Sequence, residues 1–505
     1  MVNYQFTEGT ICAPATIPGT GAISIIRVSG KEALAIADKI IDLSGGSLAE
    51  TEGYRLRYGT IFGADGSVLD NVIVSVFRAP HSYTGENSVE ISCHASRFIV
   101  NAILELLVNA GARIAAPGEF TRRAFVNGKM DLAQAEAVAD VIASQSAASH
   151  KVAMNQLKGG FSSELKVLRD KLLKMTSLLE LELDFSEEDV EFASRSELGA
   201  LVNEALSHIG RLTDSFSRGN AIKNGVPVAI VGATNTGKST LMNALLGEDR
   251  AIVSDIAGTT RDTIEETLNL GGVMFRFIDT AGIRETDEIV EKIGIERTFK
   301  KMDEASIVLG MTDLSRGENS VLADAEYIWD KVNACGARRE FLLLVNKCDV
   351  DESESVMAGE GHVAGYAGTG FPETGSGAGS ADKTGMMARI EAALREKGIS
   401  AKLIPISAKT GYGLTVLTEA LAEIGRRITG DTDETLVTNI RHYEALVRAA
   451  TALGRVRDGL QVATLPPDLI AQDLREALYH LGEIVGEIST EEVLGNIFRN
   501  FCIGK

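Results

Sequence analysis

Residues 232–239 read Gly232-Ala233-Thr234-Asn235-Thr236-Gly237-Lys238-Ser239, a match to the pattern GxxxxGK(S/T) that lies between an apolar run and a helical pattern. The backbone N–H groups of such a loop converge on phosphate oxygens, and the dipole of the following helix favours negative charge. Lys238 would reach the β- and γ-phosphates, and the Ser239 hydroxyl would join a Mg²⁺ shell. The segment therefore predicts a phosphate-binding loop, with a chance glycine-rich turn as the alternative.

Two later segments would sense Mg²⁺ and the γ-phosphate. In Gly258-Thr259-Thr260-Arg261-Asp262, the hydroxyl of Thr260 can ligate Mg²⁺ only when a γ-phosphate is present. Asp279-Thr280-Ala281-Gly282 directly follows a predicted strand, so Asp279 can hold the water shell of Mg²⁺ and the Gly282 N–H can contact the γ-phosphate.

Two further segments would recognise the base. In Asn346-Lys347-Cys348-Asp349, Asp349 can accept bonds from the guanine N1–H and 2-amino groups, a donor pair that adenine lacks. Ser407-Ala408-Lys409 ends the last predicted strand, where a base edge would lie. The five segments in this order resemble the translation-factor-like class of P-loop GTPases. The residues expected around GTP are Asn235, Thr236, Gly237, Lys238, Ser239, Thr240, Ser254, Asp255, Ile256, Ala257, Gly258, Thr259, Thr260, Asp279, Thr280, Ala281, Gly282, Asn346, Lys347, Cys348, Asp349, Ser407, Ala408 and Lys409.

The motif set lacks two parts that usually complete GTP hydrolysis. Where many small GTPases carry a water-orienting glutamine, this chain has Ile283, and no arginine is obviously placed as a finger in cis. The missing charge must therefore come from elsewhere. The amide oxygen of Asn235 and backbone carbonyls of residues 254–259 could hold a monovalent cation, as carbonyls hold K⁺ in channels.

Strand and helix patterns alternate over residues 223–430, which predicts a mostly parallel sheet with helices on both faces. Residues 123–222 and 431–505 read as helices, beginning with a capping pattern in which Asp131 is followed three residues later by Gln134. Residues 1–122 mix strands and helices. The expected fold class is therefore multidomain α/β plus α, with an α/β domain inserted in a helical one. Residues 352–386 are rich in Gly and Ser and predict a flexible surface loop.

Composition narrows the possible partners. The chain has 505 residues, too many for one hydrophobic core. Its net charge of −20 allows nucleic acid to bind only through a local basic patch or a second protein.

No apolar run approaches the roughly 20 residues of a membrane-spanning helix. Residues 1–8 show no signal peptide. We expect a cytoplasmic protein with no membrane contact, and the five scattered cysteines predict neither a disulfide framework nor a zinc site.

Four blocks together resemble the MnmE (TrmE) family of tRNA-modifying GTPases. They are the segment from Ala13 to Gly30, the segment Pro117-Gly118-Glu119-Phe120-Thr121-Arg122-Arg123-Ala124-Phe125, the GTPase motifs, and the terminal Phe501-Cys502-Ile503-Gly504-Lys505. The resemblance implies an N-terminal domain that binds folate and dimerises, and a helical domain assembled from chain on both sides of the GTPase domain.

The resemblance also implies a reaction. With an FAD-containing partner, in a heterotetramer or larger complex, the family adds a carboxymethylaminomethyl or aminomethyl group to C5 of the wobble uridine (position 34) of certain tRNAs. The one-carbon unit comes from 5-formyl- or 5,10-methylene-tetrahydrofolate. GTP hydrolysis is K⁺-dependent and is driven by dimerisation of the GTPase domains.

The resemblance assigns site residues position by position. Folate would contact Arg27, Glu90, Lys129 and Lys505; K⁺ would contact Asn235, Ser254, Ile256 and Thr259; Mg²⁺ would contact Ser239 and Thr260; and Glu291 would orient water, acting with Asn235 and Lys238. From spacing alone, Glu90 instead reads as a solvated position on an alternating strand, Arg27 and Lys129 as surface charges, and Glu291 as part of a charged stretch. Cys502 could lie near the uridine chemistry or simply pack in the tail. One departure from the family is Cys93-His94-Ala95-Ser96, where a His-Gly-Gly-type turn is common.

Two other functions are compatible with part of the sequence. A ribosome-assembly GTPase, an RNA-binding switch, explains the GTPase motifs but not the N-terminal blocks or the tail. The other is a folate-dependent methyl- or aminomethyltransferase with an incidental nucleotide domain, which predicts group transfer that is unaffected by Lys238→Ala. Contact with tRNA would require a local basic strip, for which the candidates are Arg122, Arg123, Lys129, Lys151, Lys158, Lys166 and Lys171.

Overall fold

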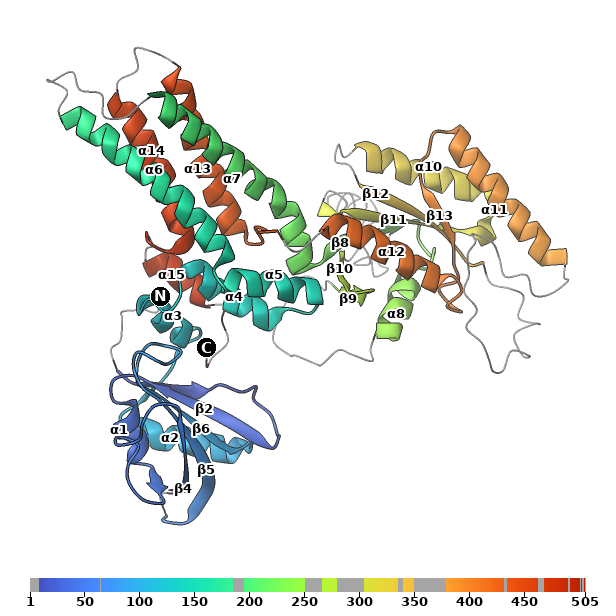
Figure 1. Ribbon diagram of the computed structural model, residues 1–505. Coiled ribbons are helices and arrows are strands. Elements are labelled where there is room, and N and C mark those ends of the chain that lie inside the picture. Colours follow the sequence, from blue (N-terminus) through green and yellow to red (C-terminus); the bar gives the residue numbers. More distant parts are fainter. Residues whose placement is uncertain are drawn as a thin grey trace, which may run out of the picture. The chain divides into compact units, whose positions relative to one another are not determined.

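The computed structural model divides the chain into two compact units (Figure 1). Unit 1 comprises Met1–Ala143, Ala153–Thr213 and Ile440–Lys505, and unit 2 comprises Ser144–Val152 and Asp214–Asn439. The structure describes residues 9–63, 65–184, 195–249, 266–278, 304–334, 339–348, 378–430, 434–461, 467–488, 491–499, 501 and 504. Among these residues, no helix has both the length and the apolar content needed to cross a bilayer.

The N-terminal part of unit 1 is a seven-stranded sheet in the order β3-β4-β5-β6-β2-β1-β7. Its strands are β1 (Ile11–Pro14), β2 (Ile23–Ser29), β3 (Ile41–Leu43), β4 (Arg55–Phe62), β5 (Val68–Phe77), β6 (Ser88–His94) and β7 (Arg113–Ile114). Neighbouring strands are antiparallel except for β1 and β7, which are parallel.

One face of this sheet packs against two helices. On β6, Val89, Ile91 and Cys93 are buried in a cluster that also contains side chains of α1 (Ala33–Asp38) and α2 (Arg97–Asn109). Glu90 and Ser92 alternate with them and are only partly buried, so the predicted alternation of this strand is confirmed. On the ribbon of β4 and β5, the opposite side chains Tyr58 and Ile73 are 57% and 48% exposed.

Helices make up most of the described residues in the rest of unit 1. They include α3 (Glu119–Val126), α4 (Leu132–Ala143), α6 (Gly160–Asp184), α13 (Ile440–Leu460), α14 (Pro467–Val485) and α15 (Glu491–Arg499), with α7 (Arg195–Asn224) running on into unit 2. Helix α14 packs against both α6 and α13 (Figure 1). The predicted capping pattern is confirmed, because the Gln134 N–H donates to Asp131 at 2.8 Å and the Asp131 N–H donates to Gln134 at 2.9 Å.

A buried ion cluster joins segments of unit 1 that are 305 residues apart in the sequence. The guanidinium of Arg441, at the start of α13, donates from Nε and Nη2 to the two carboxylate oxygens of Glu136 on α4, at 3.0 Å each. The Nε2 atom of His442 lies 2.7 Å from the same carboxylate. Arg441 also donates to the carbonyls of Glu483 and Ile484 near the end of α14. Three helices are thereby fixed at one point.

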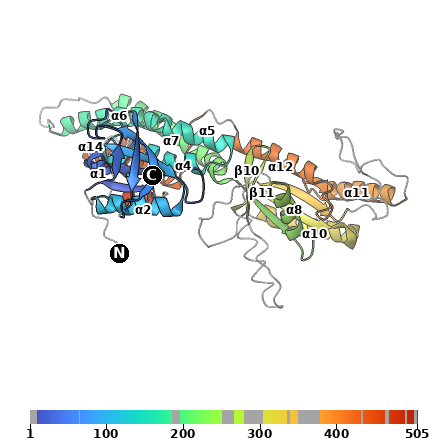
Figure 2. The same ribbon diagram turned by 90° about the horizontal axis from the view of Figure 1, so that it is seen from below.

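Unit 2 contains a six-stranded sheet in the order β13-β12-β11-β8-β10-β9. Its strands are β8 (Val226–Gly232), β9 (Glu266–Leu270), β10 (Val273–Ile278), β11 (Ile307–Asp313), β12 (Glu340–Asn346) and β13 (Lys402–Pro405). All neighbours are parallel except β9, which is antiparallel to β10. Figure 2 shows the helices around this sheet, which are α8 (Lys238–Asp249), α10 (Glu318–Ala334), α11 (Ala378–Glu396) and α12 (Leu414–Thr429). Helix α5 (Ala147–Leu157) begins in this unit.

Helices cover both faces of this sheet, as predicted. Along β8, Val228 and Ile230 belong to one core cluster, while Ala229 and Val231 belong to another. The first cluster contains side chains of α8 and α12, and the second contains side chains of α10 and α11. The strand is therefore apolar on both sides, which is why its sequence is a continuous apolar run.

Two features of unit 2 differ from the sequence prediction. Strand β9 was not predicted, because it lies at the sheet edge and buries only Leu268 fully. The predicted loop 352–386 is wrong over residues 378–386, which belong to α11. Met387, Ile390 and Leu394 anchor this helix in the core, and helix propagation from an anchored segment costs little. Residues 352–377 lie outside the described residues.

Candidate functional site

The predicted phosphate loop connects the end of β8 to the start of α8. Two of its residues have left-handed backbone, Asn235 with φ 60° and Gly237 with φ 101°. A Cβ atom at position 237 would also overlap the side-chain amide of Asn346. Glycine is thus required at 237 both by backbone conformation and by the close approach of the base-recognition segment.

The amine of Lys238 lies over the backbone of this loop. Its Nζ donates to the carbonyl of Gly232 at 2.9 Å and to that of Ala233 at 2.8 Å. Burial lowers the pKa of Lys238, because the charged amine has lost water without gaining a counter-charge. An anion at this position would supply that counter-charge. The hydroxyls of Ser239 and Thr240 lie in the first turn of α8, where both residues are exposed.

Asn346, the last residue of β12, connects three of the predicted segments. Its Nδ2 donates to the carbonyl of Thr236 in the phosphate loop at 2.7 Å, and its Oδ1 accepts from the N–H of Ala408 at 3.0 Å. The side chain is almost completely buried. The N–H of Cys348 donates to Ile406 at 3.1 Å, which holds the two base-recognition segments side by side. Lys409 is exposed.

Sequence reasoning did not single out Asp313, although this residue also belongs to the site. It ends β11, directly opposite Asn346 in the parallel ladder, and it is 3% exposed. The Nζ of Lys347 donates to its Oδ2 at 2.6 Å. An aspartate at the carboxyl end of a strand next to a base-recognition segment was the available signal, but only the strand order shows that the two strands are neighbours.

Outside the described residues lie the predicted positions Ser254, Asp255, Ile256, Ala257, Gly258, Thr259, Thr260, Asp279, Thr280, Ala281, Gly282, Glu291, Asp349, Cys502 and Lys505. The structure therefore brings together the phosphate loop and the two base-recognition segments, and the assignments at those other positions stay predictions.

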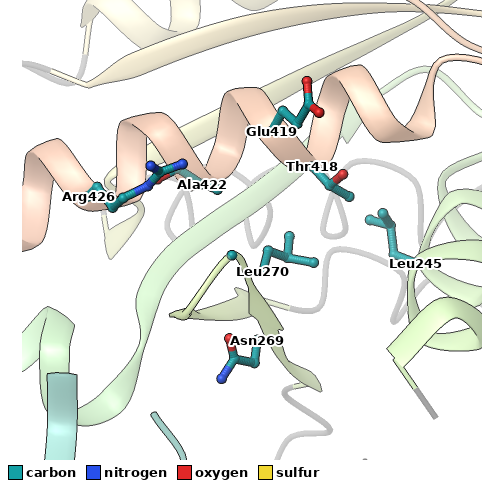
Figure 3. Close-up of a pocket in the computed structure, with 8 residues that line it drawn as sticks. Leu245, Asn269, Leu270, Thr418, Glu419, Ala422 and Arg426 are labelled. Carbon is teal, nitrogen blue, oxygen red and sulfur yellow. The ribbon is translucent and has the colours of Figure 1, made fainter. Parts of the chain in front are cut away.

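A separate hollow of about 320 Å³ lies elsewhere in unit 2 (Figure 3). It is lined by residues of α8, β9 and α12, among them Leu245, Leu270 and Thr418. None of the described residues that line it belongs to the five nucleotide segments, so this hollow is not the nucleotide site.

A second constellation of predicted residues lies on the N-terminal sheet of unit 1. Arg27 on β2 is directly opposite Glu90 on β6, and its Nε and Nη2 lie 3.0 and 2.8 Å from one carboxylate oxygen. The guanidinium is also 5.1 Å from the ring centroid of Tyr83 and 5.6 Å from that of Phe120. Glu90 is therefore a partner in a largely buried ion pair flanked by aromatic rings, and not simply a solvated strand position.

The C-terminal tail reaches this ion pair. The carbonyl of Gly504 accepts from Nη1 of Arg27 at 3.4 Å. Gly504 has φ 97°, and a Cβ atom there would overlap the carbonyl of Pro14 on β1. Lys129 donates to the carbonyl of Pro80 at 3.0 Å, in the same loop that carries Tyr83. The predicted Arg27 and Glu90 are thus brought together with the residue that precedes Lys505.

The segment from Pro117 to Phe125 meets the C-terminal helix. At the N-cap of α3, Gly118 has φ 67°, and a Cβ atom there would lie 2.7 Å from the carbonyl of Phe498 and 3.0 Å from the side chain of Phe501. Two of the sequence blocks that carried the family resemblance are therefore in contact.

Charges in this segment are largely compensated within the protein. Glu119 accepts from Arg113 and Arg123 and from the N–H of Ala116. Burial alone would raise the pKa of Glu119, but these donors outweigh it and lower the pKa. Arg123 also pairs with Glu86 at 3.0 Å. Arg123 is therefore a weaker candidate for binding RNA phosphates than its sequence position indicates.

Comparison with known proteins identifies the family. The family model described as the N-terminus of the GTP-binding protein TrmE matches residues 10–129, and the model described as the MnmE helical domain matches residues 132–502. The chain belongs to the MnmE family. A protein of Parabacteroides distasonis named tRNA modification GTPase MnmE is 49% identical to this chain, over 98% of this chain and 100% of the relative. A protein of the same name from Bacteroides fragilis is 48% identical, over 99% of this chain and 100% of the relative.

The likeness to MnmE proteins covers both units. A further MnmE protein, from Flavobacterium johnsoniae, is 46% identical over 99% of this chain and 100% of the relative. The N-terminal match runs from just before β1 to just after α3, and the helical-domain match begins at α4 and ends in the tail that reaches Arg27. The family resemblance predicted from the four sequence blocks is confirmed.

Proposed function

We propose that this chain is a tRNA modification GTPase that binds GTP between the phosphate loop and the base-recognition segments of unit 2. The observation that carries this proposal is the pair of hydrogen bonds from Asn346, which hold Thr236 and Ala408 at fixed positions on either side of one site. A site built in this way can bind the phosphates and the base of a single nucleotide. The names of the relatives, tRNA modification GTPase, favour the same activity.

The domain organisation follows from this assignment. Residues 1–122 form the tetrahydrofolate-binding and dimerisation domain, residues 223–430 form a P-loop GTPase domain, and residues 123–222 and 431–505 form the helical domain into which it is inserted. The exposed apolar face of the β4–β5 ribbon, with Tyr58 and Ile73 paired across the strands, supports a homodimer, because a face of this kind is usually covered by a partner.

The residues that would hold the metal ions are all oxygen donors, which suits hard cations. Ser239 and Thr260 would bind Mg²⁺, and Asn235, Ser254, Ile256 and Thr259 would bind K⁺. When bound, the two ions would neutralise charge that develops on the phosphates, a role that an arginine finger has in other GTPases. The exposed position of Asn235 on the loop leaves its amide accessible when a second GTPase domain approaches. Glu291 would orient the attacking water.

The Arg27–Glu90 pair has the chemistry to recognise a tetrahydrofolate. A carboxylate accepts from the N–H edge of a pterin, a guanidinium binds carboxylates, and Tyr83 and Phe120 supply flat apolar surfaces. Lys129 and Lys505 would add positive charge for the glutamate tail. The folate would supply the one-carbon unit, and an FAD-containing partner would complete the addition to C5 of uridine 34.

Two measurements test this function. GTP turnover should be much faster in KCl than in NaCl at equal ionic strength, and Lys238→Ala should abolish it in both; equal wild-type rates in the two salts would remove the cation from the mechanism. Calorimetry with 5-formyltetrahydrofolate should show binding to the wild type and to Lys238→Ala alike. Absence of folate binding, combined with co-sedimentation with ribosomes, would favour a ribosome-assembly switch instead.

A further inference from the structure

A short turn after β11 contacts both ends of the nucleotide site. It consists of Asp313, which ends the strand, the single 3₁₀ turn Leu314–Arg316, and Gly317. Asp313 contacts the base-recognition segment through Lys347, while Arg316 contacts the phosphate loop through Thr234. Nothing in the five nucleotide motifs includes this turn.

The base end of the turn is a buried carboxylate with several donors. Asp313 accepts from the Nζ of Lys347 at 2.6 Å, from the N–H of Ser315 at 2.9 Å and from the Ser315 hydroxyl at 2.6 Å. Burial alone would raise the pKa of Asp313, but these hydrogen bonds outweigh it and lower the pKa. The carboxylate is therefore ionised at neutral pH and holds the amine of Lys347 with a charge-assisted bond.

The bond between Lys347 and Asp313 matters because of the backbone conformation at Lys347. This residue has φ 64°, a left-handed conformation that a residue with a Cβ atom adopts only when its surroundings hold it there. Asp349, the predicted guanine reader, follows two residues later in the sequence. A change at Lys347 would therefore alter the backbone of residues 346–348, which lead into Asp349 in the sequence.

The phosphate end of the turn is a single side chain. The Nη2 atom of Arg316 donates to the carbonyl of Thr234 at 3.1 Å, and its Nε lies 3.9 Å from Asp313. The acceptor is a neutral carbonyl, so this contact lacks the opposite charge that strengthens the bond between Lys347 and Asp313. It nevertheless links the phosphate loop to the same turn that holds Lys347.

We propose that the turn 313–317 is a brace for the nucleotide site, in which Asp313 is a positioning residue for guanine recognition and Arg316 is a positioning residue for the phosphate loop. The inference rests on the proposed GTP site and goes beyond it, since neither residue belongs to the five nucleotide segments. Loss of the contact between Asp313 and Lys347 should affect recognition of the guanine 2-amino group. Loss of the contact between Arg316 and Thr234 should not.

The test compares GDP with IDP, which lacks only the 2-amino group. In fluorescence competition titrations of the full chain, Asp313→Asn should weaken GDP binding about tenfold and IDP binding by less, because a recognition site that is misaligned loses most for the group that it reads. The preference for GDP over IDP should therefore fall. Arg316→Gln should weaken both nucleotides by the same factor and leave the preference unchanged.

Two further variants serve as controls. Asp330→Asn makes the same chemical change on an exposed position of α10 and should bind both nucleotides like the wild type. Ser315→Ala removes one of the donors to Asp313 and should lower the GDP preference in the same direction by less, which keeps the test available if Asp313→Asn does not fold.

The outcomes separate this inference from the function on which it rests. If the wild type binds neither GDP nor GTP, the proposed function is wrong. Suppose that the wild type binds GDP and that Asp313→Asn and Ser315→Ala prefer GDP over IDP as strongly as the wild type does. The proposed role of the turn 313–317 would then be wrong, while the proposed GTP site would remain supported. A uniform loss for both nucleotides in Asp313→Asn would show that Asp313 supports the fold and has no role in guanine recognition.

Discussion

Replacing Glu136 by glutamine should uncouple the helices of unit 1 that meet at its carboxylate. The side chain is 10% exposed and is bound by the guanidinium of Arg441 and by His442. In the Glu136→Gln variant these donors keep a neutral partner but lose the charge that balances them. Removing one member of a buried ion pair is costly, because the remaining charge stays buried without compensation.

The size of the expected loss of stability follows from the pKa of Glu136 in the folded protein. Burial alone would raise its pKa, but His442 and Arg441 together lower it from 4.5 to about 2. Because the pKa is lower in the folded protein, the carboxylate stabilises the fold fully above pH 4.5 and progressively less as the pH falls towards 2. At 1.36 kcal/mol per pKa unit, the ionised group contributes about 3 kcal/mol at neutral pH. Glu136→Gln should lower the free energy of unfolding of unit 1 by a similar amount.

The single tryptophan of the chain makes the assay specific to one unit. Trp329 lies on α10 in unit 2, so its fluorescence follows unfolding of that unit, whereas far-ultraviolet circular dichroism follows all the helices. In urea, Glu136→Gln should move the dichroism transition of the helices to lower concentration and leave the fluorescence transition in place. Glu444→Gln, an exposed position on α13, is the matched control.

Two results would refute this reasoning. One is a decrease in the free energy of unfolding of unit 1 that is no larger in Glu136→Gln than in Glu444→Gln. Such a result would mean that the ion cluster adds no net stability. The other is a stability difference between the wild type and Glu136→Gln that stays constant from pH 6 to pH 3, since the titration requires that difference to shrink as Glu136 takes up a proton.

Two other substitutions test the nucleotide site and the tail. Asn346→Ala removes the hydrogen bonds to Thr236 and Ala408. It should weaken GDP binding about a hundredfold in equilibrium titrations, because two buried groups lose their partners. Near-normal affinity would contradict the role given to Asn346. Gly504→Ala places a Cβ atom against the carbonyl of Pro14 and should weaken 5-formyltetrahydrofolate binding about tenfold while GTP turnover is unchanged. An unchanged folate affinity would exclude the tail from that site.

Features that depend on neighbouring residues in the sequence were predictable. The strands of unit 2 are continuous apolar runs because both faces of the sheet are covered. The start of α4 was indicated by Asp131 and Gln134 alone, since the capping interaction is local. The phosphate loop likewise needs no more than its own eight residues and the elements on either side.

Features that depend on distant pairing were not predictable from local patterns in the sequence. Arg27 and Glu90 are opposite one another only because β2 and β6 are neighbours in a particular register. Asp313 belongs to the nucleotide site only because β11 lies beside β12. The contact of Gly118 with the C-terminal helix joins segments that lie far apart in the sequence, and no local pattern encodes it.

The split composition of unit 1 has a consequence for biosynthesis. Helix α14 covers α6, yet the ribosome must first translate residues 214–439, which takes of the order of ten seconds or more at about 5–20 residues per second. During that delay the nascent α6, which carries the buried Leu165, Leu172 and Leu179, lacks a helix that packs against it in the finished protein. We therefore expect the emerging polypeptide to need chaperone protection until its last helices arrive, and chains that terminate early to be degraded.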